Sequence, residues 1–137
     1  MRYYLDTNIL IYFLFEKESI TDDVYNLIDD PSSFLYVSAV AVQEIVHLYK
    51  LKKIYARGFQ TASDIVKTIE EVGIIIKPLN KHHLLQYALL ETEADHKDPT
   101  DHIIIAQAMA DKIPIISTDR KFKKYVKQGL DFIFNGK

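Results

Sequence analysis

Five carboxylates of the sequence could act together, because each lies just after an apolar run of strand length or in a helix beside one. They are Asp6, Glu44, Asp98, Asp101 and Asp119. Two bare negative charges about 4 Å apart repel each other by about 4 kcal/mol at an effective dielectric constant near 20. No lysine within the surrounding motifs balances several such charges. The sequence therefore predicts a cation bound among them.

The types of side chain favour a particular class of ion. Carboxylate oxygens suit Mg²⁺ or Mn²⁺ rather than zinc, since the sequence has neither cysteine nor a spaced histidine pair. Ions of this class serve phosphoryl chemistry, because they activate a water and stabilise the charge on a phosphate. A metal-dependent phosphodiesterase is the reaction class that follows.

Three of the acids also have a purely local use. Asp98 precedes Pro99 and suits a helix N-cap, and Asp119 can cap a later helix. Asp101 falls in a first helical turn, where the helix dipole favours a negative charge. Glu44 has no such use, because the helix around it is otherwise apolar and an unpaired buried carboxylate is costly. For Asp98, Asp101 and Asp119, a local role in a helix and a role in metal binding therefore both remain open.

The positions of these acids depend on strands and helices that alternate along the chain. Strands are expected at residues 3–5, 34–38, 74–76, 114–117 and 130–134. Helices are expected at 9–15, from a start within 19–23, at 39–53 and 63–72, after Asn80, from Asp98 to about 109, and as a short basic segment after Asp119. This alternation predicts an α/β fold, a three-layer α/β/α sandwich around a central parallel sheet.

The acids also select the order of the strands. The first, second and fourth expected strands lead to acids, whereas the third delivers only Asn80 and Lys81. Ligands bind beyond the carboxyl ends of parallel strands, so the acid-bearing strands should be neighbours. The order 3-2-1-4-5 achieves this, and the flavodoxin-like order 2-1-3-4-5 does not.

Composition indicates one ordinary domain. The chain has 137 residues, of which 48% are hydrophobic and 26% charged, with no linker and no internal repeat. It shows no signal-peptide pattern and no apolar run of membrane-spanning length, so a cytoplasmic protein without membrane attachment is expected. The absence of cysteine agrees with a reducing compartment.

Net charge gives no global attraction to nucleic acid, because the formal sum is −2. Positive charge is nevertheless concentrated in two runs. They are Lys50, Lys52, Lys53 and Arg57, and Arg120, Lys121, Lys123, Lys124 and Lys127. Either run could be a solvated helix face, or the two could steer phosphates toward the acids.

Four motifs occur in a fixed order. They are Leu5-Asp6-Thr7-Asn8, Ser38 followed by Glu44, His96-Lys97-Asp98-Pro99-Thr100-Asp101 leading into 103–108, and Ser117-Thr118-Asp119. Together they resemble the PIN domain, most closely the VapC-type toxin ribonucleases of prokaryotic toxin-antitoxin pairs. The resemblance covers nearly the whole chain and implies a single PIN-like nuclease domain over residues 1–137.

The resemblance also implies roles for particular residues. Asp6, Glu44, Asp101 and Asp119 would hold one or two Mg²⁺ or Mn²⁺ ions, with Asp98 as an accessory acid. Cleavage of single-stranded or looped RNA is the implied endoribonuclease activity. In the resulting hypothesis Asp6 and Asp101 orient the attacking water, and Thr7, Asn8 and Thr118 either orient carboxylates or cap helices.

Toxins of this family have protein partners. The resemblance implies a type II antitoxin, received in an apolar groove, and a homodimer formed through a self-complementary face. Candidate groove residues, which could equally belong to the core, are Tyr12, Phe13, Phe15, Leu51 and Ile54.

Two residues depart from the family pattern around the third acid. Thr100 and His102 stand where the family often has phenylalanine and arginine. A structural or solvent-facing role is expected for His102, and a helix-surface role for His47, although His47 could face the site. His82 and His83 are assigned no role.

Several alternatives remain on the sequence alone. A PIN nuclease could act in RNA processing or turnover without an antitoxin, or the domain could be a catalytically idle metal- or RNA-binding scaffold. A signalling receiver would need an aspartate after the third strand, where Asn80 stands. A haloacid-type phosphatase would need an aspartate in place of Asn8.

Overall fold

The computed structural model describes residues 1–54 and 58–136. Five strands form one sheet in the order β3-β2-β1-β4-β5, and every neighbouring pair is parallel. The strands are β1 (Arg2–Leu5), β2 (Phe34–Ser38), β3 (Ile75–Lys77), β4 (Ile115–Ser117) and β5 (Phe132–Phe134). The predicted strand order is confirmed, with strand ends that differ by one or two residues from the expected ranges.

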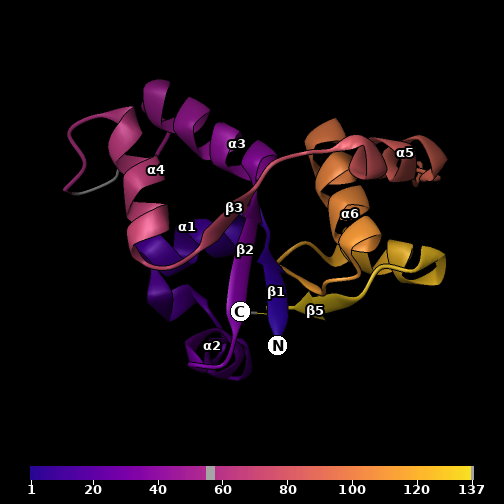
Figure 1. The fold of residues 1–137 in the computed structure, drawn as a ribbon, viewed down its shortest axis with the longest axis horizontal. Helices are drawn as coiled ribbons and strands as arrows, with labels where there is room; N and C mark the ends of the chain where they lie inside the picture. The colour runs from indigo at the N-terminus through magenta and orange to yellow at the C-terminus, as the bar shows by residue number, and fades with distance from the viewer. Residues whose placement is uncertain (55–57, 137) are drawn as a thin grey trace.

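Helices cover both faces of this sheet, which confirms the three-layer architecture (Figure 1). Figure 1 shows α3 and α4 on one side of the sheet and α5 and α6 on the other. The α-helices are α1 (Thr7–Phe15), α2 (Asp22–Asp29), α3 (Ala39–Lys50), α4 (Ala62–Glu71), α5 (Lys81–Leu89) and α6 (Pro99–Asp111), and the 3₁₀ helices are η1 (Lys17–Ser19) and η2 (Arg120–Gln128).

Two helices differ from the sequence expectation. α3 ends at Lys50 rather than at residue 53, because Lys52 has a φ of 59°, a left-handed conformation that an α-helix does not contain. The basic segment after Asp119 is a helix, as expected, but one with 3₁₀ geometry. Arg57, the last member of the first basic run, lies outside the described residues.

The sheet carries the core of the molecule. Tyr4 and Leu5 of β1 and Ile115 and Ile116 of β4 are fully buried, as expected for central parallel strands covered on both faces. Among residues 1–54 and 58–136, no helix combines the length and the hydropathy that a membrane crossing requires.

Helix N-caps fix several polar side chains at the carboxyl edge of the sheet. Asp6 ends β1 in an extended conformation and accepts a hydrogen bond from the Thr7 amide, which starts α1. Ser38 accepts from the amide of Val40 at the start of α3. Asp98 and Asp119 do the same for α6 and η2. The local roles expected for Asp98 and Asp119 are therefore present.

Candidate active site at the carboxyl edge of the sheet

Asp6 is the buried centre of the site, with only 5% of its surface exposed. Its Oδ2 accepts a 2.7 Å hydrogen bond from Ser117 Oγ at the end of β4. The pKa of Asp6 is raised to about 7, mainly by burial and also by the negative charges of Asp101 and Glu44, while the hydrogen bonds from Ser117 and Thr7 oppose this rise. Acids from three separate elements thus interact electrostatically.

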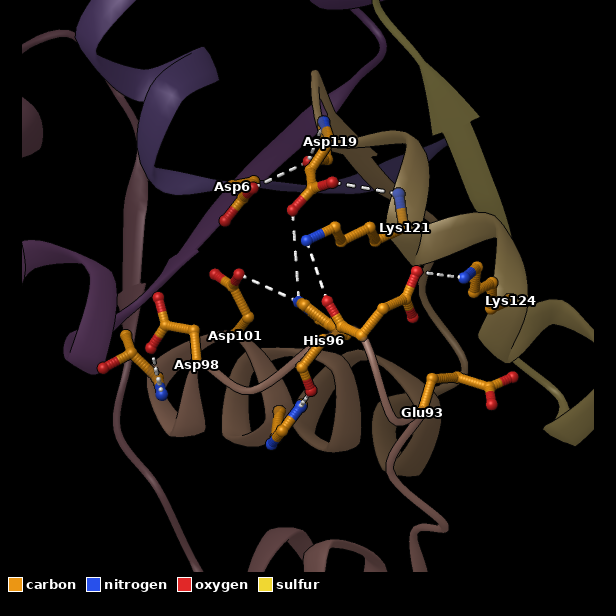
Figure 2. Close-up of polar contacts among 12 residues, drawn as sticks. Asp6, Glu93, His96, Asp98, Asp101, Asp119, Lys121 and Lys124 are labelled. Atoms are coloured by element: carbon orange, nitrogen blue, oxygen red, sulfur yellow. Dashed lines mark hydrogen bonds and ion pairs between the residues drawn. The ribbon is translucent and has the colours of Figure 1, made fainter.

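Asp101 connects the first turn of α6 to this centre. Burial raises the pKa of Asp101, the hydrogen bond from His96 lowers it, and the charges of Asp98 and Asp119 raise it. Figure 2 shows the carboxylates of Asp6, Asp101 and Asp119 directed toward a common space, with Asp98 at its border. The fold therefore brings Asp6, Asp101 and Asp119 together, although they are far apart in the sequence.

Glu44 joins the group from α3. Its side chain is half-buried and lines a cavity of about 320 Å³ together with Val40, Gln43, His47 and Thr100. The charge of Glu44 raises the pKa of Asp6, and Thr100, between Asp98 and Asp101 in the sequence, lines the same cavity, so the cavity adjoins the acid cluster. The partial exposure of Glu44 lowers the burial cost that the sequence suggested. His47 is exposed on its helix but borders this cavity.

His96 is a member of the cluster that sequence reasoning missed. It is 3% exposed, and its Nε2 lies 3.0 Å from Asp101 Oδ2 and 4.0 Å from Asp119 Oδ2. One ligand atom from each of these three residues lies within 4.8 Å of the others. A histidine five positions before Asp101 was the available signal, but its position depends on Tyr125, whose hydroxyl is 2.9 Å from His96 Nδ1.

The residues around the third acid take structural roles. His102 is buried, and its Nε2 donates to the His96 carbonyl over 2.6 Å, which confirms the structural reading of this histidine. Support for Asp101 comes from His96 rather than from the residue that follows it. Thr100 is partly exposed and faces the cavity beside Glu44.

The three residues predicted to support the acids lie at the cluster but make few contacts with it. Asn8 Nδ2 donates to Thr118 Oγ1 over a long 3.4 Å. The hydroxyl of Thr7 is buried and finds no hydrogen-bond partner within the described ranges. Ser117 has the bridging position instead, since its Oγ donates to Asp6 and accepts from the Asp119 amide.

Positive charge is scarce inside the cluster. Across residues 1–54 and 58–136, no side-chain nitrogen of a lysine or arginine lies within 4.0 Å of a carboxylate oxygen of the five acids. Lys121 reaches into the view of Figure 2, but its ammonium donates to the carbonyl of Asp95 over 2.8 Å. Uncompensated carboxylate oxygens, one of them on a buried residue with a raised pKa, fit a divalent cation with oxygen ligands.

Comparison with known proteins agrees with this geometry. A family model described as PIN domain matches residues 3–128. A search of curated protein sequences finds no match. Solved structures of similar fold include VapBC2 from Rickettsia felis bound to a DNA fragment from their promoter, with a TM-score of 0.73, 20% identity and 98% of each chain covered.

Two further structures share this fold. VapBC-1 from nontypeable Haemophilus influenzae gives a TM-score of 0.71 at 22% identity, with 100% of each chain covered. A toxin-antitoxin complex from Klebsiella pneumoniae gives 0.64 at 15% identity, with 96% of each chain covered. These likenesses support the fold, and the family model spans most of the sequence. The chain therefore belongs to the PIN domain family.

Proposed function

We propose that this protein is a metal-dependent endoribonuclease that cleaves single-stranded or looped RNA, and that it is the toxin of a type II toxin-antitoxin pair. The observation that carries the proposal is that Asp6, Asp101 and Asp119 point toward one space, and that the charges of Asp101 and Glu44 both raise the pKa of Asp6. A phosphodiester hydrolase of the PIN family needs such an acidic centre.

Asp6, Glu44, Asp101 and Asp119 would hold one or two Mg²⁺ or Mn²⁺ ions, with Asp98 as an accessory acid at the border. When bound, such ions lower the pKa of water and stabilise negative charge on a phosphate. The protein contributes the orientation of the ligands. Ser117 holds one oxygen of Asp6, and His96 holds one oxygen of Asp101.

The lone pairs that these hydrogen bonds leave unused on the two acids would orient the attacking water for in-line displacement at the phosphate. Asp6 Oδ1 and Oδ2 already accept from the Thr7 amide and Ser117, so the carboxylate cannot rotate freely. Because burial raises the pKa of Asp6 to about 7, a cation that binds beside it must also displace a proton near neutral pH. Metal affinity and proton release are therefore coupled at this residue.

The antitoxin part of the proposal is supported by surfaces of the chain. Tyr12, Phe13 and Phe15 of α1 are only partly buried, Leu51 is exposed, and Ile54 packs at the border of the core. Solved structures with the same fold are described as a toxin-antitoxin complex and as a member of a family of toxin-antitoxin systems. We propose that an antitoxin segment covers this apolar surface.

A second apolar surface supports the homodimer. Leu84, Leu85 and Leu89 of α5 are all exposed, and Leu89 has 76% of its surface free. Such a patch on one helix suits a self-complementary contact between two copies. Leu89→Lys should shift the protein from dimer to monomer in light-scattering measurements.

An endoribonuclease toxin acts where cellular RNA is, so we propose a cytoplasmic location.

The test of the activity is a comparison of the wild type with Asp6→Asn and Asp101→Asn, using end-labelled RNA and Mn²⁺. Cleavage by the wild type and its loss in both folded variants is the expected result. Full activity in both variants would contradict the proposed site. Expression with the product of a neighbouring small reading frame should suppress the cleavage, whereas unaffected cleavage would favour an RNA-processing nuclease.

A further inference from the structure

We infer that a second pocket, beside the acid cluster, binds a nucleotide of single-stranded RNA that flanks the cleaved phosphate. It is lined by Arg120, Lys123, Val126, Phe132 and Phe134 and has a volume of about 360 Å³. The inference rests on the proposed ribonuclease function and names a subsite for its substrate. Two cations and two aromatic rings are the combination by which proteins hold single strands, since cations attract phosphates and rings stack on bases.

The 3₁₀ geometry of η2 sorts its basic residues into separate rows. Such a helix has three residues per turn, so positions i, i+3 and i+6 share one face. Phe122 and Tyr125 form the row that is buried in the core. The other two rows are Arg120, Lys123 and Val126, and Lys121, Lys124 and Lys127. The first of these lines the pocket.

The remaining row is already occupied by other partners. Lys121 Nζ donates to the carbonyl of Asp95 over 2.8 Å, and Lys124 forms an ion pair with the carboxylate of the same residue. Lys127 Nζ lies 3.2 Å from Glu93 Oε1. Three of the five charges of this run therefore face protein groups.

Arg120 and Lys123 have no such partners. Neither the guanidinium nitrogens of Arg120 nor the Nζ of Lys123 lie within 4.0 Å of a carboxylate oxygen anywhere in 1–54 or 58–136. Lys123 and Val126 are exposed, with 47% of Val126 free, so the row is open to a ligand. Positive charge in this pocket is thus available to a phosphate.

The aromatic side chains form one wall of the pocket. Phe132 and Phe134 alternate along β5 and so point to the same face, with ring centroids 6.2 Å apart. Phe132 also packs on the buried ring of Phe122. The guanidinium of Arg120 lies 4.9 Å from the centroid of Phe134. A guanidinium above a ring can stack with a base and donate hydrogen bonds to a phosphate.

The position of the pocket connects it to the acids. Phe134 is the register partner of Ser117 in the neighbouring strand. The backbones of neighbouring strands lie about 4.8 Å apart. Ser117 Oγ in turn bonds Asp6, and Arg120 directly follows Asp119. A strand of RNA whose phosphate lies at the acids can therefore place an adjacent nucleotide in this pocket.

Binding measurements can test the subsite without cleavage. The probe is a fluorescent single-stranded oligoribonucleotide of mixed sequence, with Mn²⁺ present, and the protein carries Asp101→Asn. Adding Arg120→Gln and Lys123→Gln should weaken binding about tenfold and reduce the slope of log K against log salt by about 1.4, since each phosphate contact on a single strand contributes about 0.7. Phe134→Leu should weaken binding about fivefold or more, because a stacking surface is lost.

The matched control removes the same two charges from the paired row, as Lys124→Gln with Lys127→Gln. This pair should change the affinity and the salt slope much less than the pocket pair does. Unchanged affinity and slope in the pocket pair would overturn the subsite, while loss of RNA cleavage in Asp6→Asn alone would still support the proposed function. If the pocket pair instead lost only self-association or a copurified protein, the pocket would belong to a protein partner and the subsite would be wrong. Absence of any RNA cleavage by the wild type would overturn the proposed function and the subsite together.

Discussion

His96 Nε2 lies 3.0 Å from Asp101 Oδ2, and this contact fixes the third acid of the cluster from outside α6. An ionised carboxylate can only accept, so Nε2 carries the proton. In the neutral ring Nδ1 is then an acceptor, and the Tyr125 hydroxyl 2.9 Å away donates to it. The same hydroxyl accepts from the Glu93 amide over 3.1 Å. A continuous chain of hydrogen bonds thus orients Asp101.

The first prediction concerns this chain. His96→Gln should weaken Mn²⁺ binding about 10- to 100-fold, the usual cost of losing a group that orients a metal ligand. Mn²⁺ titration by calorimetry measures this directly, and cleavage of RNA should fall with it. His82→Gln is the matched control, because His82 is exposed at the start of α5. Equal Mn²⁺ affinity in the two variants would show that His96 only packs against its neighbours.

The second prediction concerns Asp6 and pH in the absence of metal. The folded pKa is about 7 and the ordinary value is 3.8, so between these values the unfolded chain has lost a proton that the folded chain keeps. The unfolded state then binds fewer protons, and the free energy of unfolding falls as pH rises from about 4 to about 7. A difference of about three pKa units corresponds to about 4 kcal/mol at most.

Asp6→Asn removes this dependence. In EDTA, urea unfolding at pH 4 should give similar free energies for the wild type and the variant, and at pH 7.5 the variant should be the more stable protein. Mn²⁺ at pH 7.5 should then stabilise the wild type much more than the variant. A constant difference in stability between the two proteins across this pH range would refute the pKa assignment.

The third prediction concerns Ser117. Ser117→Ala leaves Asp6 Oδ2 and the Asp119 amide without their shared partner, at a cost of about 1 kcal/mol in stability. The Ser117 hydroxyl lowers the pKa of Asp6, so this pKa should be higher in the variant. The free energy of unfolding of the variant should therefore keep falling to a higher pH than that of the wild type. Thr118→Ala serves as the comparison, since its hydroxyl accepts only one long bond from Asn8. Identical pH profiles in both variants would contradict the role of Ser117.

The fold was predictable because its signals are local. Strand-forming runs, helix periodicity and caps such as Asp98-Pro99 can each be read within a few residues. The carboxyl ends of parallel strands then meet by topology, which brings Asp6, Asp101 and Asp119 together without further information. The predicted end of α3 was wrong, because nothing in the lysine-rich sequence around Lys52 indicates that this residue adopts a left-handed conformation.

The parts of the site that could not be predicted depend on distant partners. His96 meets Tyr125, 29 residues later, and Ser117 meets Asp6, 111 residues earlier. Neither pairing follows from spacing within one element. The rows of η2 also required the structure, because in an α-helix residues three and four apart share a face, whereas in a 3₁₀ helix only residues three apart do.

The last prediction concerns His83, to which the sequence assigned no role. The ring is buried, accepts from the Asn80 amide over 3.0 Å and lies 2.9 Å from Asp111 Oδ1, while the Tyr4 hydroxyl donates to Oδ2 of the same carboxylate. Because the Asn80 amide occupies Nδ1, the proton of the neutral ring is on Nε2 and is donated to Asp111. His83→Leu should therefore cost about 2 kcal/mol in urea unfolding, since an amide and a carboxylate lose their partner. His83→Gln, which can still donate, should cost less, and Mn²⁺ affinity and RNA cleavage per folded molecule should stay at the wild-type level in both variants. Reduced Mn²⁺ affinity in a fully folded His83→Leu protein would instead connect this network to the acid cluster.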